Sequence, residues 1–166
     1  MQVKDKIGNI ISYPIKNRTI DYVLLEWYET NKRILHKTSQ MGREISMKFL
    51  KENPYLNVGD IIYEDDAVLI AIDIKECDVI VIRPRSMSEV AAICYEIGNK
   101  HLPLFYQEEE LLVAYETPLF ALLTTGGYDV ELVKRKLIRP LKTTVTAHGN
   151  SSNGLFNSII KISIDK

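Results

Sequence analysis

The sequence predicts an α+β protein made of two small domains and a tail. Up to about residue 75, short runs of β-forming residues alternate with turn residues, a spacing typical of a small β-sandwich or barrel. Beyond residue 75, two helical patterns interrupt four strand-like runs. Their order, strand, helix, strand, strand, helix, strand, is that of a ferredoxin-like (βαββαβ) domain. We therefore expect an all-β N-terminal domain at 1–75, a ferredoxin-like domain at 76–142 and a flexible tail at 143–166.

The β-forming runs of the first domain each end at a recognisable turn. A run from Tyr22 to Tyr28 is rich in aromatic and branched residues, and residues 33–38 and 44–49 alternate between apolar and polar side chains. Residues 40–43 contain a glycine and separate the two alternating runs. Further strands are expected at 61–63 and 67–72, on either side of a polar turn at 64–66.

In the second domain, the strand expected at 78–83 ends at a proline. Ser86 and Glu89 then form a capping-box pattern, and Val90, Ile93, Cys94 and Ile97 share one helical face, which predicts a helix over 87–98. The remaining elements are strands at 104–106 and 110–115, a helix from Thr117 or Pro118 to Gly126–Gly127, and a strand at 130–137. In the polar tail, only the last few residues could add an edge strand.

Composition restricts the possible functions. The chain has 166 residues and a net charge of −1, so it has no basic field to attract nucleic acid. It contains no apolar run of about 20 residues and no signal-peptide core, so we expect a cytoplasmic protein that does not span a membrane. In that reducing compartment Cys77 and Cys94 are expected to be free, buried thiols. Two cysteines and three histidines are too few for a zinc-finger or iron–sulfur cage within one chain.

Two of the three histidines, His101 and His148, are the candidate ligands. The chain has no phosphate-binding loop, dinucleotide fingerprint, nucleophile elbow or two-histidine helix motif, so no enzyme signature is present. His101 follows the predicted helix, where the helix dipole favours a cation. Its position alone fits a packed structural histidine as well as a metal ligand. His148 lies in the tail, where it is either a solvent-exposed histidine without a role or a mobile ligand. His36 lies within an alternating strand and is assigned no site.

Three stretches of the chain are informative together: residues 21–30, residues 90–101 and Pro103-Leu104. They resemble the urease accessory protein E (UreE) family of nickel metallochaperones, and the resemblance extends over essentially the whole chain. The most specific stretch is Ile97-Gly98-Asn99-Lys100-His101, where the family usually has Gly-Asn-Arg-His. Some members carry further histidines in the following hairpin and a long histidine-rich tail, whereas this hairpin begins Glu108-Glu109-Glu110 and this tail has His148 alone.

The resemblance implies a non-enzymatic chaperone that delivers Ni²⁺ to apo-urease. It implies an N-terminal domain sometimes called peptide-binding, and a homodimer through the C-terminal domains with His101 of both chains at one metal site. His148 is the expected additional ligand, and the urease accessory GTPase and the complex of apo-urease with its accessory proteins are the expected partners. Imidazole suits Zn²⁺ and Cu²⁺ as well as Ni²⁺, so the ligands do not select the metal. The alternative is a two-domain protein-interaction module in which metal binding is incidental.

Overall fold

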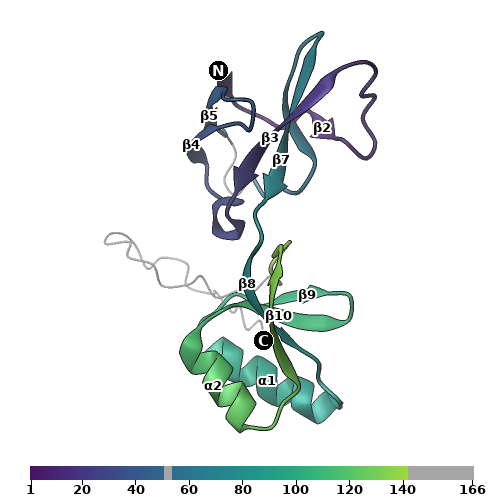
Figure 1. The fold of residues 1–166 in the computed structure, drawn as a ribbon. Helices are drawn as coiled ribbons and strands as arrows, with labels where there is room; N and C mark the ends of the chain where they lie inside the picture. The colour runs from purple at the N-terminus through teal and green to yellow at the C-terminus, as the bar shows by residue number, and fades with distance from the viewer. Residues whose placement is uncertain (51–53, 142–166) are drawn as a thin grey trace, which may run out of the picture.

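The computed structural model describes residues 1–50 and 54–141, which form two parts (Figure 1). The N-terminal part holds strands β1 to β7, and the C-terminal part holds β8 to β11 with helices α1 and α2. The chain passes from one part to the other where β7 (Val68–Ile74) leads into β8 (Cys77–Ile82). The expected tail and its edge strand lie outside the described residues.

Two sheets share a core in the N-terminal part. One has the order β1-β5-β4 and the other β2-β6-β7-β3. Buried side chains from both sheets, such as Met47 of β5 and Ile70 of β7, belong to one apolar cluster, which confirms an all-β arrangement. The strands are β1 (Gln2–Val3), β2 (Gly8–Asn9), β3 (Thr19–Leu25), β4 (Ile34–Thr38), β5 (Glu44–Lys48) and β6 (Asp60–Glu64).

The expected strand from Tyr22 to Tyr28 is too long, because β3 ends at Leu25 and a 3-10 helix, η1 (Trp27–Glu29), follows. The turn closes on itself through two reciprocal hydrogen bonds. The Glu29 amide donates to the Glu26 carbonyl at 2.9 Å, and the Glu26 amide donates to the Glu29 carboxylate at 3.0 Å. These local bonds outweigh the β propensity of the aromatic residues and point Trp27 away from the strand direction.

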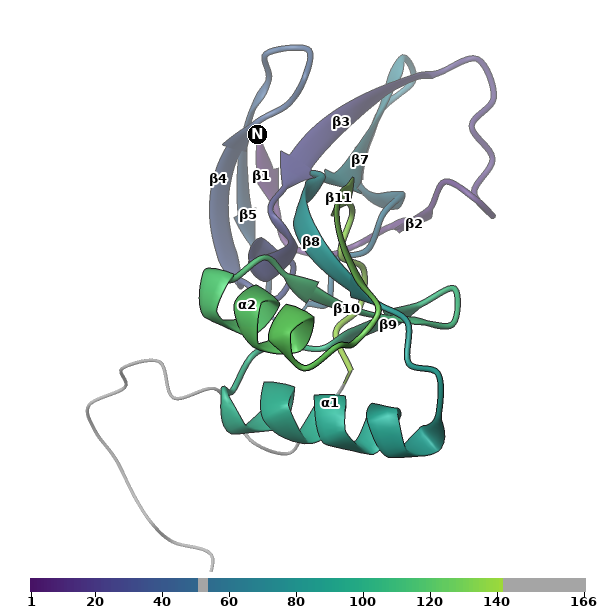
Figure 2. The ribbon, with the colours of Figure 1, turned by 60° about the horizontal axis from the view of Figure 1, so that its bottom comes forward.

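The C-terminal part has the expected βαββαβ order. Its antiparallel sheet has the strand order β11-β8-β10-β9. Both helices pack on one face of this sheet (Figure 2), where Ile93 of α1 and Leu119 of α2 meet the strand residues Ile80 and Leu111. The elements are α1 (Met87–Asn99), β9 (Phe105–Gln107), β10 (Glu110–Ala114), α2 (Thr117–Thr125) and β11 (Val130–Arg135).

The capping box expected at the start of α1 forms only in part. Ser86 Oγ accepts a hydrogen bond from the Glu89 amide at 3.2 Å, as the pattern predicts. The Glu89 carboxylate, however, accepts from the Arg85 amide at 2.8 Å and pairs with the Arg85 guanidinium. The Glu89 amide of the first turn is still satisfied, as is the Arg85 amide just before the N-cap, so the helix begins where the sequence indicates.

In the N-terminal part, the carboxylate of Asp21 is completely buried and lies 2.6 Å from Arg43 Nη1. Burial raises the pKa of Asp21. Hydrogen bonds from Ser39, Arg43 and the Met41 amide lower this pKa by more than burial raises it, so the net shift is downward. A carboxyl group whose pKa is lowered by folding stabilises the protein above its unfolded pKa. That contribution disappears as the pH falls through the folded pKa.

Asp21→Ala is therefore expected to lower the free energy of unfolding by about 2–3 kcal/mol at pH 7, the value of hydrogen bonds to a buried charge. The difference from the unaltered protein should shrink at pH 3, because this pH is below the pKa of about 3.9 of an unfolded aspartate, so the unfolded chain already binds the proton. Urea unfolding at both pH values measures it. Asp66→Ala is the control, because Asp66 is exposed and should change stability by less than about 0.5 kcal/mol. A loss for Asp21→Ala that is equal at both pH values would contradict the assignment.

Candidate metal site

His101 follows Lys100, the C-cap residue of α1, and is part of a Schellman motif. The Leu102 amide donates to the Ile97 carbonyl at 3.3 Å, and the His101 amide donates to the Gly98 carbonyl at 3.0 Å. Ile97 and Leu102 also pack in the same apolar cluster, the contact that usually accompanies this motif. The helix end thus fixes the backbone of His101 on both sides.

The backbone of His101 is left-handed, with φ of 55°. Glycine is the usual residue at this position, because a Cβ atom makes the left-handed region unfavourable by about 1–2 kcal/mol. Strained conformations of this kind concentrate at functional sites. His101 is also exposed, so its imidazole is presented to solvent at the negative end of the helix dipole.

The exposed face of α1 leads to His101 and carries no charged side chain. Its residues are Met87, Ser88, Ala91, Ala92, Tyr95, Gly98 and Asn99. Glu89 and Glu96, the two acidic residues of the helix, are half-buried. Tyr95 is 70% exposed and is the largest apolar side chain at the centre of this face. An uncharged helix face of mostly small residues around one aromatic side chain can approach another protein surface closely.

The described residues contain no group of three His, Cys, Asp or Glu side chains able to hold a metal ion. Both thiols are poor ligands at neutral pH. Burial raises the pKa of Cys94, and burial together with Glu26 and Asp78 raises that of Cys77, so both remain protonated. The described part of one chain therefore does not supply the further ligands that a metal ion bound at His101 would need.

The hairpin between β9 and β10 carries three consecutive glutamates, Glu108 to Glu110, and arginines already bind two of them. Glu110 pairs with Arg135 and, at 2.6 Å, with Arg83, and Glu108 lies 2.9 Å from Arg135. Burial raises the pKa of Glu110, and the two guanidinium groups lower it by more. The carboxylates of Glu108 and Glu110 thus pair with arginines of the same sheet.

The tail begins beside the segment that carries His101. The Leu141 amide donates to the Leu104 carbonyl at 2.7 Å, and Pro140 forms a β-bridge with Phe105. The candidate ligand His148 lies outside the described residues. It is seven residues beyond Leu141, a length that spans at most about 25 Å when fully extended. No sequence pattern indicated this anchoring, because the paired residues are far apart in the chain.

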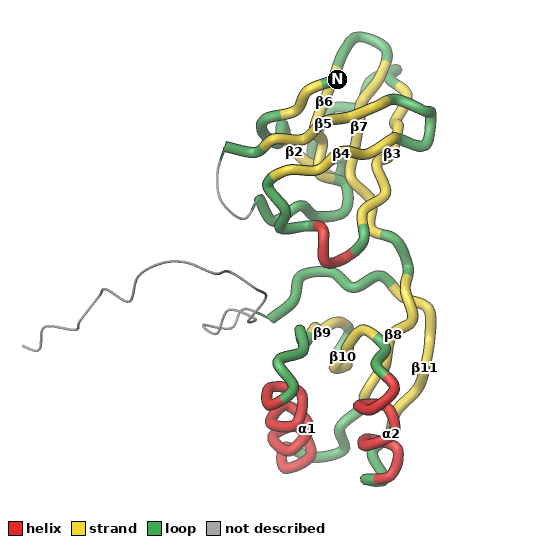
Figure 3. Tube along the Cα trace, turned by 90° about the vertical axis from the view of Figure 1, so that its left-hand side faces the viewer, coloured by secondary structure: helices red, strands yellow, loops and turns green. Residues whose placement is uncertain are grey.

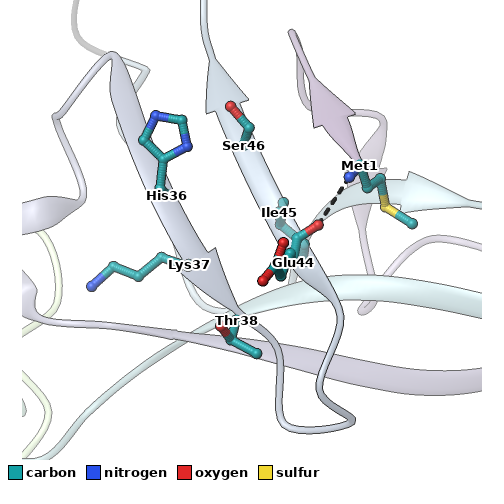
Figure 4. A pocket seen from close by; sticks show the side chains of 7 residues that line it. All are labelled: Met1, His36, Lys37, Thr38, Glu44, Ile45 and Ser46. Atoms are coloured by element: carbon teal, nitrogen blue, oxygen red, sulfur yellow. Dashed lines mark hydrogen bonds between the residues drawn. The ribbon is translucent and has the colours of Figure 1, made fainter.

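His36 lies in the other part of the molecule, on the exposed face of β4. It pairs with Ser46 of β5 and lines an open hollow of about 530 Å³ (Figure 4). The other lining residues are Met1, Lys37, Thr38, Glu44, Ile45 and Ser46. The hollow thus holds no second His or Cys side chain. The structure therefore places His36 and His101 in different parts of the chain.

The fold and the helix-end histidine define a class: a two-domain α+β protein in which a β-rich N-terminal part precedes a ferredoxin-like part with one exposed candidate ligand. Residues 3–75 match the model of the UreE urease accessory protein N-terminal domain, and residues 77–152 match that of the C-terminal domain. The chain belongs to the UreE urease accessory protein family. No helix among the described residues is long and apolar enough to cross a membrane.

Individual relatives support the same assignment. The urease accessory protein UreE of Flavobacterium johnsoniae is 44% identical over 163 residues, covering 98% of this chain and 99% of the relative. That of Actinobacillus pleuropneumoniae is 39% identical, covering 84% of this chain and 77% of the relative. That of Helicobacter pylori is 36% identical and covers 92% of both chains.

Proposed function

We propose that this chain is a nickel-binding metallochaperone of urease maturation, which carries Ni²⁺ to apo-urease in the cytoplasm and has no catalytic activity of its own. Membership of the UreE family supports the link to urease. The observation that carries the metal-binding part is the exposed, left-handed His101 at the end of α1. A residue kept at an unfavourable backbone position indicates a function that a glycine would not provide.

The ligand count supports a homodimer with one shared metal site. In a two-fold symmetric dimer the same residue occurs twice at the axis, so two copies of His101 can reach one Ni²⁺. The uncharged face of α1 that ends at His101 is the surface we assign to this contact. It lets the helices approach without burying unpaired charges, which would oppose association.

Two features suit delivery rather than storage. His101 is exposed, so a bound ion stays accessible to the next protein in the pathway, and few ligands per chain favour exchange. We assign the transfer to the urease accessory GTPase and the complex of apo-urease with its accessory proteins, and we assign residues 76–142 to metal binding and dimerisation. Since imidazole also binds Cu²⁺ and Zn²⁺, selectivity for nickel depends on the metal supply and on these partners.

Isothermal titration with Ni²⁺, combined with light scattering to measure the mass, tests this proposal. The expected result is a dimer with one tight site, whose affinity falls at acid pH because only neutral imidazole binds a metal ion. A monomer, or a dimer without a tight site for Ni²⁺, contradicts it. Such a result, together with purified protein that retains no nickel by elemental analysis, would favour a protein-interaction module.

His148→Ala is expected to weaken Ni²⁺ binding by about tenfold while leaving the dimer intact. The tail leaves the C-terminal part at Leu141, which lies beside Leu104, and His148 follows seven residues later. We therefore expect the tail to add a ligand without forming part of the core. A tenfold loss of affinity is near the lower end of the range seen when residues that support a metal site are mutated. Titration and light scattering on the variant measure both quantities. Unchanged affinity would remove His148 from the site, and a monomeric variant would give the tail a structural role instead.

A further inference from the structure

The two parts of the molecule meet through Trp27. The indole ring of Trp27 stands edge-to-face on Phe105, with ring centres 5.6 Å apart and planes at 87°. Phe105 is 1% exposed and belongs to an apolar cluster on the sheet face opposite the helices. The other strand residues of that cluster are Val79, Val81 and Leu112. A residue of the N-terminal part thus covers the second face of the C-terminal sheet.

The position of η1 explains this contact. Figure 3 shows η1 at the end of the N-terminal part that faces the C-terminal sheet. Because β3 ends at Leu25 and the chain turns, the indole leaves the N-terminal core and enters the cluster around Phe105. An aromatic pair in this geometry contributes about 0.5–1.5 kcal/mol beyond the area it buries.

Two polar contacts hold the same two parts together. Lys136 Nζ donates to both carboxylate oxygens of Asp73, at 2.7 and 2.8 Å, and Arg139 Nε donates to Asn57 Oδ1 at 2.8 Å. Both donors lie between β11 and the start of the tail. With Trp27 they make three separate contacts between the two parts.

These contacts converge on the segment that carries the candidate ligand. Phe105 follows His101 by four residues, and Leu104 and Phe105 pair with Leu141 and Pro140. The N-terminal part therefore holds both the chain leaving His101 and the chain leading into the tail. Loss of the indole would uncover Phe105 and allow both segments to shift.

We propose that Trp27 is a positioning residue for the metal site, through which the state of the N-terminal domain and metal binding at His101 influence each other. The proposal rests on the proposed function, because it requires metal to bind at His101. Such coupling is reciprocal: if docking of Trp27 on Phe105 raises metal affinity, metal binding must strengthen the docking by the same factor. Trp27 is the only tryptophan in the chain, so its fluorescence reports the docking directly.

The first test follows Trp27 emission while Zn²⁺ is added to the full-length protein. Zn²⁺ is closed-shell, so a change reflects the surroundings of the indole rather than quenching by a paramagnetic ion. The emission should change and saturate at the metal ratio found by calorimetry, and His101→Asn should abolish the change. Tight Zn²⁺ binding with unchanged emission overturns the coupling alone. No metal binding at all overturns the coupling and the proposed function together.

The second test measures the Ni²⁺ affinity of variants at the contact. Trp27→Ala should weaken binding roughly 3- to 10-fold, which is within the range for coupling through packed side chains. Trp27→Phe, which keeps a ring on Phe105, should stay within about twofold. Lys136→Met should also weaken Ni²⁺ binding, and it leaves the apolar core unchanged. This variant replaces Trp27→Ala in the test if Trp27→Ala fails to fold. Lys134→Met is the matched control, because Lys134 pairs at 2.8 Å with Asp78 inside the C-terminal part. Unchanged affinity in Trp27→Ala overturns the proposal, and if Trp27→Ala does not fold, unchanged affinity in Lys136→Met overturns it.

Discussion

His101→Asn is expected to remove the tight Ni²⁺ site while leaving the fold and the dimer intact. Asparagine tolerates the left-handed backbone that His101 adopts, with φ of 55°, so the Schellman motif should persist. Loss of a supporting residue at a metal site costs about 10–100-fold in affinity, and the variant loses the ligand itself from both subunits. The affinity should therefore fall by at least roughly 100-fold, as measured by calorimetry.

Two further variants distinguish a role of His101 as a metal ligand from a purely structural role. His101→Gly should also abolish the site, yet raise the free energy of unfolding by up to about 1 kcal/mol, because glycine has no Cβ penalty at this position. His36→Ala removes an imidazole of the N-terminal part, 65 positions away in the chain, and should leave metal affinity unchanged. Tight binding that survives in both His101 variants, or that disappears in His36→Ala, contradicts the assignment.

Phe105→Ala is expected to lower the free energy of unfolding by about 3–5 kcal/mol, the usual cost of truncating a buried aromatic side chain. Phe105 is 1% exposed and supports Trp27, so the variant leaves a cavity between the two parts of the molecule. Such a loss is a large fraction of the stability of a typical domain. Urea unfolding followed by circular dichroism measures it.

The neighbouring residue supplies a matched control. Tyr106 follows Phe105 in β9 but points to the other face and is 54% exposed, so Tyr106→Ala should change stability by less than about 1 kcal/mol. Phe105→Leu, which keeps most of the apolar volume, should lose less than Phe105→Ala. Equal losses in Phe105→Ala and Tyr106→Ala would mean that Phe105 does not fill the core as described.

The elements of the C-terminal part were predictable because their signals are local. The helix expected at 87–98 is α1 (Met87–Asn99), and the glycines expected to end the second helix do so, with Gly127 at a φ of 75°. In the N-terminal part, β1 and β2 were not predicted, since two-residue strands have no periodicity to detect. The pairing of β3 with β7 is parallel, which strand propensity does not indicate.

The candidate site shows the same division. The position of His101 at a helix end followed from spacing, and its choice as a metal ligand came from the resemblance to the UreE family. The left-handed backbone of His101 was not predicted. The predicted helix end just before the polar residue His101 is a sequence signal that could have indicated it. The contact of Trp27 with Phe105, which are 78 positions apart, had no sequence signal.

The sequence by itself determined the α+β class, the order of helices and strands in the second half and the scarcity of metal ligands. These depend on side-chain periodicity, caps and counts, which act within a few residues. The tertiary structure alone decided that Leu141 lies against Leu104 and that an indole of the N-terminal part supports the segment after His101. Such contacts join residues far apart in the chain, and only the packing of complete elements determines which of them meet.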